Sequence, residues 1–357
     1  MNSEFLNQGR FQVELTSTDM LVPKDHLLRL IDEHIDFSFI TEKTKPFYTQ
    51  TLGRPPIPPI RLFKMMLIGY LYGIRSERQL EIEISLNVAY RWFLGLGLNE
   101  RVPDHSTISY NRNTRFKDSD LFQDIFDELV HVAIHHRMVA GRLLFTDATH
   151  IRADANNNRY TMQIIEETPR AYLKELEEAV QEDRAQHGKK PLPPKKEDEE
   201  AEPRKTSLTD PESGYMMRIG KPEGFHYLEH RTVDHKFGII TDVHITSGTV
   251  NEPVVYIDRL QRQIRTFGFT ELEAIALDSG YLTPYVCKKT IGMNLFATIA
   301  NRKTPTKEGM LSKSDFTYDP EQDAYRCPQG QTLPYNMTTR DGHRVYFSDP
   351  TQCASCS

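Results

Sequence analysis

The stretch Leu143-Leu144-Phe145-Thr146-Asp147 is a short apolar run that ends on a single Asp, and Ala274-Ile275-Ala276-Leu277-Asp278 repeats this pattern. A carboxylate inside a packed sheet is costly unless a positive charge accompanies it. Two such carboxylates on adjacent strands suggest a divalent metal site, the chemistry of phosphodiester cleavage by bound Mg²⁺. The alternative is that Asp278 merely ends a strand and Asp147 caps a neighbour. The spacing alone does not decide between the two.

Composition sets broad limits on the class of protein. The chain has 357 residues, 38% hydrophobic and 26% charged, which is ordinary for a soluble protein with about two or three domains. No apolar run is long enough to span a membrane, and Met1-Asn2-Ser3-Glu4 does not begin a signal peptide, so a cytoplasmic protein without a membrane partner is expected. The net charge of −6 counts against DNA binding. Its acidic excess is concentrated in residues 165–202, however, and local charge matters more than the total.

Residues 1–140 are predicted to be mostly helical. Apolar residues recur near the helical period over residues 23–40, 62–72 and 121–130. A Pro-rich stretch at residues 54–59 is predicted to form a stiff connector. The segment Ser76-Glu77-Arg78-Gln79 has the form of a capping box that opens another helix.

After Gly141 the pattern becomes that of strands. Alternating residues of 142–153, which include Asp147, share one face. Further strands are expected at residues 225–234, 238–247, 272–278 and 294–300, with helices that begin at Asn251-Glu252-Pro253 and Thr283-Pro284. This order predicts a mixed α/β sheet. The insertion at 155–215 is polar and rich in Pro, and is expected to be a flexible excursion.

Several motifs resemble those of bacterial insertion-sequence DDE transposases. Phe145-Thr146-Asp147-Ala148-Thr149-His150 is similar to the first catalytic block of this family, and Leu277-Asp278-Ser279-Gly280-Tyr281 is similar to the second. The resemblance covers nearly the whole chain, in order. Residues 89–96 and 102–109 are similar to an InsH-type N-terminal domain. Further similar segments are Thr209-Asp210-Pro211-Glu212 and Gly224-Phe225-His226-Tyr227, which leads to Val233-Asp234.

The resemblance implies an all-helical DNA-binding domain at residues 1–140. It implies an RNase H-like catalytic domain at residues 141–357, with a Cys-containing insertion at 303–357. Asp147 and Asp278 would hold Mg²⁺ or Mn²⁺ for strand cleavage and transfer. The partners would be double-stranded DNA, namely the terminal inverted repeats and the target, and a second copy of the chain in a homodimer. The setting would be the bacterial nucleoid.

One departure from the family concerns its third acid, a Glu on a later helix. Glu308 lies in a Lys-rich loop and Glu321 in a turn, so neither is a convincing candidate. The chain is therefore interpreted as C-terminally truncated and is expected to bind DNA without joining it. Two alternatives remain: a catalytically inactive DNA-binding remnant, and a metal-dependent nuclease of the same fold.

Residues 76–117 are the best candidate for DNA binding, because two helices separated by Gly95-Leu96-Gly97-Leu98 resemble a helix-turn-helix. Ser106 and Thr107 would lie at a helix N-terminus, where backbone amides favour phosphate. Positive charge would come from Arg91, Arg112, Arg115 and Lys117. An ordinary solvated helix with scattered Arg residues is the alternative.

Three cysteines, Cys327, Cys353 and Cys356, have spacing suited to a structural Zn²⁺ site but supply only three ligands. Reduced structural thiols are the alternative. The histidines form no HExxH pattern, so a zinc hydrolase is not favoured, and most of them are expected to be exposed or hydrogen-bonded; they are His226, His230, His235 and His244.

Overall fold

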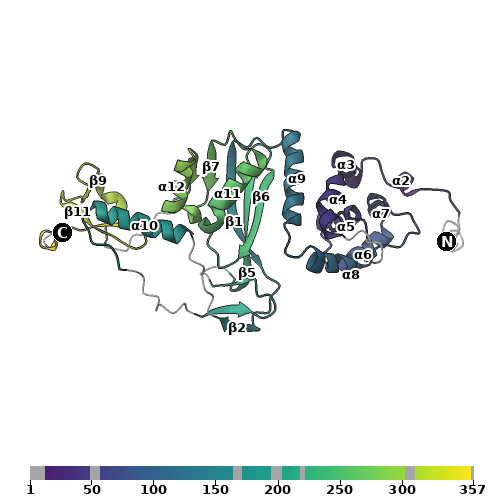
Figure 1. Ribbon diagram of the computed structural model, residues 1–357, viewed down its shortest axis with the longest axis horizontal. Helices are drawn as coiled ribbons and strands as arrows, with labels where there is room; N and C mark the ends of the chain where they lie inside the picture. Colours follow the sequence, from purple (N-terminus) through teal and green to yellow (C-terminus); the bar gives the residue numbers. More distant parts are fainter. Residues whose placement is uncertain are drawn as a thin grey trace, which may run out of the picture. The chain divides into compact units, whose positions relative to one another are not determined.

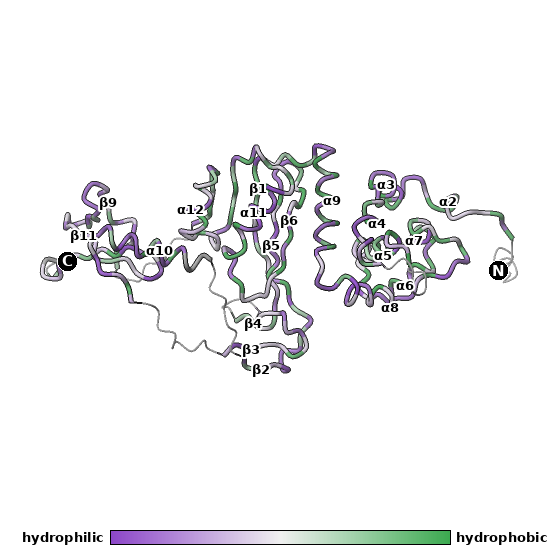
Figure 2. Tube along the Cα trace, viewed as in Figure 1, coloured by the Kyte–Doolittle hydropathy of each residue, from purple (hydrophilic) through white to green (hydrophobic). Residues whose placement is uncertain are grey.

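The computed structural model describes residues 13–48, 57–163, 171–193, 203–217, 222–301 and 310–354. The chain divides into two compact units, Met1–Val132 and Ala133–Ser357, here called the N-terminal and C-terminal units. The boundary falls within helix α9 (Leu121–His135), along which hydrophobic and hydrophilic residues alternate (Figures 1 and 2). Each unit is described by itself.

Every described element of the N-terminal unit is helical. Helix α5 (Pro59–Leu71) is apolar on several sides and buries Leu62, Met65 and Ile68 in the core. The other helices of this unit besides α9 are α2 (Thr18–Leu21), α3 (Leu27–His34), α4 (Ser38–Thr44), α6 (Glu77–Leu86), α7 (Val88–Phe93) and α8 (His105–Tyr110), with short turns η1 (Lys45–Phe47) and η2 (Asn111–Arg115).

The predicted capping box at the start of α6 is only half formed. The Ser76 side chain accepts a hydrogen bond from the Gln79 backbone amide, as expected. The Gln79 side chain instead donates to Glu83, one turn further along the helix (2.9 Å). The helix is therefore capped from one side only.

The C-terminal unit contains the predicted mixed sheet. Its strands run in the order β4-β5-β1-β7-β8, and β6 also pairs with β5. Strands β5 and β1 are antiparallel, whereas β7 and β8 run parallel to β1. The strands are β1 (Leu143–Arg152), β4 (Gly214–Met216), β5 (Gly224–Asp234), β6 (Ile240–Ser247), β7 (Ala274–Leu277) and β8 (Phe296–Ile299). The predicted strands are confirmed to within two residues at each end.

Two helices connect the parallel strands, α11 (Pro253–Phe267) after β6 and α12 (Pro284–Gly292) after β7. Both crossovers move in the same direction across the sheet, so a right-handed connection places both helices on one face. The helices contact each other, and α11 also contacts β6 (Figure 1). Helix α11 ends before Gly268, whose left-handed conformation (φ 65°) stops the helix.

The opposite face of this sheet is exposed. Phe145 on β1 is 46% exposed and Phe296 on β8 is 73% exposed. The expectation that Asp147 lies inside a packed sheet is therefore wrong, because Asp147 shares the Phe145 face, which α11 and α12 do not cover. An exposed carboxylate has no large desolvation cost to offset.

The insertion is more ordered than predicted. Helix α10 (Ala171–Gln186) contacts β11, and its Asp183 accepts hydrogen bonds from Thr338 and Arg344. The following residues fold back on the helix, since the Leu192 amide donates to Gln181 (3.0 Å). The acidic run at residues 197–200 lies outside the described residues.

Smaller sheets complete the C-terminal unit. Strands β2 (Tyr160–Gln163) and β3 (Arg204–Ser207) form an antiparallel pair. A four-stranded sheet has the order β12-β11-β10-β9. Its members are β9 (Thr317–Asp319), β10 (Ala324–Arg326), β11 (Thr332–Thr338) and β12 (Arg344–Tyr346), and the remaining short elements are η3 (Ser279–Tyr281), η4 (Lys313–Asp315) and α13 (Pro350–Cys353).

Candidate metal centre

Asp147 and Asp278 lie at equivalent positions of two paired strands. Strand β1 is parallel to β7 with Thr146 opposite Leu277, so the next residue of each strand is an Asp. Both Asp residues are exposed and both line one hollow of about 520 Å³. The sheet therefore brings together two carboxylates that are far apart in sequence, as the two Asp-terminated runs predicted.

Asp147 lies in the middle of β1, where pairing with β5 fixes its backbone, directly after the last residue that pairs with β7. Its Oδ1 accepts a hydrogen bond from the Ala148 amide (2.7 Å). Arg231 lies directly opposite on β5 and also lines the hollow. The Arg231 guanidinium forms an ion pair with Glu229 and is half exposed. The hollow thus contains one positive charge that is already paired.

Asp278 follows β7 and precedes the 3-10 turn η3. Its backbone is extended (φ −72°, ψ 166°), and its side chain makes no capping hydrogen bond to the turn. The turn is closed instead by the Asp278 carbonyl, which accepts from the Tyr281 amide (3.1 Å). A helix-capping role therefore does not explain why residue 278 is an Asp, and its carboxylate could contact a ligand.

The donor set at this site fits a divalent cation. Like charges at adjacent positions of a sheet repel each other, and a cation between them would relieve the repulsion. Carboxylate oxygens are the ligands that Mg²⁺ and Mn²⁺ prefer. Asp147 and Asp278 are the residues that would hold the ion.

Among the described residues, one group of three has ligand atoms close enough to hold a metal, namely Glu81, Asp104 and His105 of the N-terminal unit. Glu81 accepts hydrogen bonds from the His105 amide and from its ring Nδ1, at 2.9 and 2.8 Å. These bonds lower the pKa of Glu81. They tie α6 to the start of α8, so the cluster has a structural explanation.

Asp234, from the Val233-Asp234 motif, has a structural role that the sequence did not reveal. Its side chain is fully buried. The carboxylate accepts hydrogen bonds from the backbone amides of Ala140, Gly141 and Lys236, at 3.2, 2.8 and 2.9 Å. Asp234 therefore anchors the segment that leads into β1.

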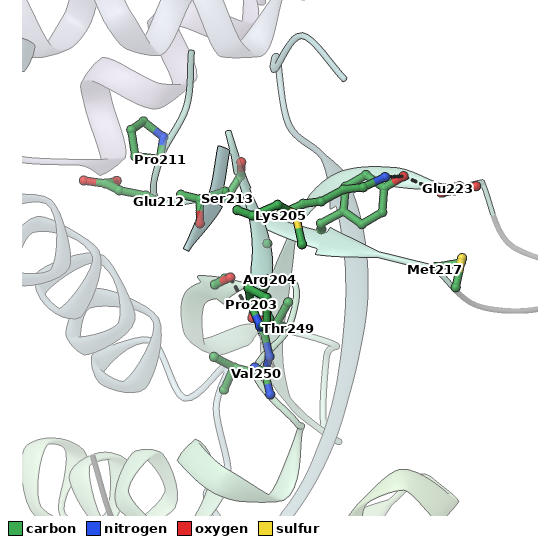
Figure 3. Close-up of a pocket in the computed structure, with 15 residues that line it drawn as sticks. Pro203, Arg204, Lys205, Pro211, Glu212, Ser213, Met217, Glu223, Thr249 and Val250 are labelled. Carbon is green, nitrogen blue, oxygen red and sulfur yellow. Dashed lines mark hydrogen bonds between the residues drawn. The ribbon is translucent and has the colours of Figure 1, made fainter. Parts of the chain in front are cut away.

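The Thr209-Asp210-Pro211-Glu212 motif lies near a second hollow, of about 560 Å³, in which Pro211, Glu212 and Ser213 are grouped (Figure 3). Asp210 accepts a hydrogen bond from the Tyr227 hydroxyl (2.5 Å). Lys205, which also lines this hollow, lies over the ring of Tyr215 at 4.2 Å. The motif thus fixes the loop between β3 and β4.

The predicted DNA-binding residues have different environments. Arg91 is only 5% exposed, and its guanidinium donates to the carbonyls of Gly97 and Glu100. This burial argues against a DNA contact by Arg91, because the charge is used to hold the Gly95–Leu98 turn. Asp104 accepts from both the amide and the hydroxyl of Ser106, at 2.8 and 2.5 Å. A carboxylate thus already occupies the helix N-terminus that was predicted to favour phosphate.

The other predicted DNA contacts are more accessible. Arg112 is exposed and pairs with Glu77 (3.0 Å). The Arg115 guanidinium lies 4.4 Å from the centre of the Tyr48 ring and donates to Asn111. Lys117 is exposed, and Thr107 lies in the first turn of α8. Their contacts with DNA stay predictions.

The two described cysteines of the predicted zinc site have other partners. Cys327 Sγ accepts from the Gln331 amide (3.3 Å), and Cys353 Sγ donates to Ser348 (3.0 Å). Cys356 lies outside the described residues, as does Glu308. The zinc site therefore stays a prediction. Glu321 lies in the turn between β9 and β10, as expected.

Histidines gather on the helix-covered face of the sheet. His230 and His244 lie opposite each other on β5 and β6. His230 is 5% exposed, and its Nε2 lies 3.0 Å from the Thr246 hydroxyl. Burial lowers the pKa of His230 to about 4, and burial likewise lowers the pKa of His244. Both are neutral at neutral pH, in keeping with a role in packing.

The chain therefore combines an α/β unit, in which two Asp residues line one hollow beside the sheet, with a helical unit. Residues 16–114, less than a third of the chain, match the family model described as Transposase domain (DUF772). No curated protein matches the chain. Within the ranges that the structure covers, no helix has the length and apolar character needed to cross a bilayer.

Two solved structures are similar to the chain at low identity. The Mos1 strand transfer complex is 12% identical over 71% of this chain and 62% of its own, with a TM-score of 0.22. The piggyBac transposase synaptic complex with hairpin DNA is 10% identical over 93% of this chain and 66% of its own, with a TM-score of 0.33. The chain spans less than two thirds of each, and these TM-scores do not establish a shared fold.

Proposed function

We propose that the protein is a DNA transposase of the DDE class, from an insertion sequence, which cleaves and transfers strands at the element's ends with Mg²⁺ or Mn²⁺. The observation that supports this proposal is that Asp147, in the middle of β1, and Asp278, at the end of β7, directly follow a pair of opposed strand residues and line one hollow. The match of residues 16–114 to a transposase domain supports it independently.

The chemistry follows from the donor set. Bound divalent cations would activate a water or a 3′-hydroxyl and stabilise the departing oxygen of a phosphodiester. Asp147 and Asp278 would orient these ions from rigid strand positions. Arg231 lines the same hollow and would contact the DNA backbone, whose phosphates attract Arg side chains.

The partners proposed are the terminal inverted repeats and the target DNA. The N-terminal unit would bind the repeats, with Arg112, Arg115 and Lys117 as the accessible candidates. A homodimer would hold two ends together. The protein would act at the bacterial nucleoid.

The test is a cleavage assay with DNA from either side of the coding sequence, in Mg²⁺. We expect the protein to bind this DNA and to cut it in a metal-dependent way, with cutting lost in Asp147→Asn and Asp278→Asn. Cleavage that persists in both variants would contradict the proposal. Joined products distinguish a transposase from a nuclease of the same fold, which gives nicks alone. Binding without either product is the outcome expected of an inactive remnant.

A further inference from the structure

We propose that Glu252 supplies a third carboxylate to the metal site formed by Asp147 and Asp278. This inference rests on the proposed function, because it assigns a further ligand to the same site. Glu252 immediately precedes α11, and its φ of −49° and ψ of −47° are already helical. The sequence alone identified this residue only as the start of a helix.

The evidence begins at Gly280, two residues after Asp278. A Cβ atom on Gly280 would lie 1.8 Å from Glu252 Oε2 and 2.9 Å from its carboxyl carbon. Any other residue at position 280 would collide with this carboxylate, so the close approach requires glycine. The Glu252 carboxylate therefore lies directly against the turn that carries Asp278.

The packing of α11 explains how Glu252 arrives there. Glu252 and Tyr256 are four residues apart, so they lie on the same face of the helix. The Tyr256 ring packs edge-on against the Tyr281 ring, with centroids 5.3 Å apart. The helix face that bears Glu252 is thus fixed over the turn Ser279–Tyr281, next to the end of β7.

Tyr281 provides a second, independent observation. Its side chain is 0% exposed, and its hydroxyl has no hydrogen-bond partner among the residues that the structure describes. Burial raises the pKa of Tyr281, and the carboxylates of Glu252, Asp147 and Asp278 raise it further. All three carboxylates thus act electrostatically on the same buried hydroxyl. A buried polar group without a partner is rare and points to a ligand at the site.

Three carboxylates that share one ion would form a more complete ligand set than two. Mg²⁺ and Mn²⁺ prefer octahedral oxygen coordination, in which carboxylates and waters share the positions. Asp147 comes from the middle of β1, Asp278 from the end of β7 and Glu252 from a helix start, so the three side chains belong to separate elements. Glu252 precedes β7 in the chain, so it is a different position from the Glu on a later helix for which Glu308 and Glu321 are considered.

The test is a Mn²⁺ titration of the full chain by calorimetry. We expect Glu252→Gln, which keeps the side-chain size but removes the charge, to weaken Mn²⁺ binding at least about 10-fold. The matched control is Asp258→Asn, which changes an exposed acid on the same helix and should leave Mn²⁺ affinity unchanged. Thermal melting of each variant reports whether it folds, and Glu252→Asp replaces Glu252→Gln if the latter does not fold.

Gly280→Ala tests the geometry without removing the acid. The added methyl group should displace the Glu252 carboxylate and weaken Mn²⁺ binding, but should cause no further loss in a Glu252→Ala background, where the space is free. Gly292→Ala is the control, because nothing lies within 4 Å of a Cβ at that position.

The outcomes separate this inference from the proposed function. If Asp147→Asn and Asp278→Asn weaken Mn²⁺ binding but the Glu252 variants do not, the role of Glu252 is overturned and the two-Asp site stands. If neither Asp variant weakens binding, the proposed function itself fails.

Discussion

Acid should weaken the C-terminal unit because His230 is buried in its neutral form. Burial lowers the pKa of His230 to about 4, from an ordinary value of 6.5. The unfolded chain therefore takes up a proton at a higher pH than the folded chain does. As the pH falls from about 6.5 to about 4, this group progressively favours the unfolded state.

The size of the effect follows from the gap between these pKa values. At 1.36 kcal/mol per pH unit, a gap from 6.5 to about 4 corresponds to roughly 3 kcal/mol, or about 2 kcal/mol after allowance for solvent screening. Urea unfolding at pH 7, 5.5 and 4.5, followed by near-ultraviolet circular dichroism, would measure it. His230→Gln should flatten the loss of stability over this range, whereas His343→Gln, at an exposed position, should not. An unchanged pH dependence in His230→Gln would refute the reasoning.

Three further predictions concern residues outside the metal site. Asp234→Ala should destabilise the C-terminal unit by roughly 3–5 kcal/mol, because it leaves buried backbone amides without their charged acceptor. Urea unfolding measures the loss of stability, and a loss below about 1 kcal/mol would contradict the prediction. Arg91→Ala should lower the melting temperature of the N-terminal unit, because the buried Arg91 guanidinium donates hydrogen bonds to backbone carbonyls. Weaker DNA binding with an unchanged melting temperature would instead show that Arg91 acts at the surface. Lys117→Ala and Arg112→Ala should each weaken binding to all DNA sequences and reduce the salt dependence of binding. Fluorescence anisotropy at several salt concentrations measures both effects, and an unchanged salt slope would exclude phosphate contacts by these residues.

The strands could be predicted from the sequence because their signal is local. Alternation along residues 142–153 identified β1 and the face that Asp147 shares with Phe145. The exposure of that face could not be predicted, because it depends on both crossover helices packing on the other side. The β2–β3 pair and the β9–β12 sheet could not be predicted, since all of these strands except the seven-residue β11 have only three or four residues and carry too little periodicity.

The candidate site was partly predictable for the same reason. Asp147 and Asp278 each end or interrupt an apolar run, and this contrast is visible in sequence. Glu252 has no such signal, because only the packing of α11 over the Ser279–Tyr281 turn brings it to Gly280. The environment of Arg91 could not be predicted either. Its charge suggested a surface residue, but its burial depends on how the Gly95–Leu98 turn folds back onto α7.

The placement of a cation between two sequence-distant carboxylates is tested most directly by anomalous scattering from a crystal of the protein soaked in Mn²⁺. We expect an anomalous peak about 2.1 Å from oxygens of both Asp147 and Asp278. Carboxylates that point apart, with no peak between them, would contradict it.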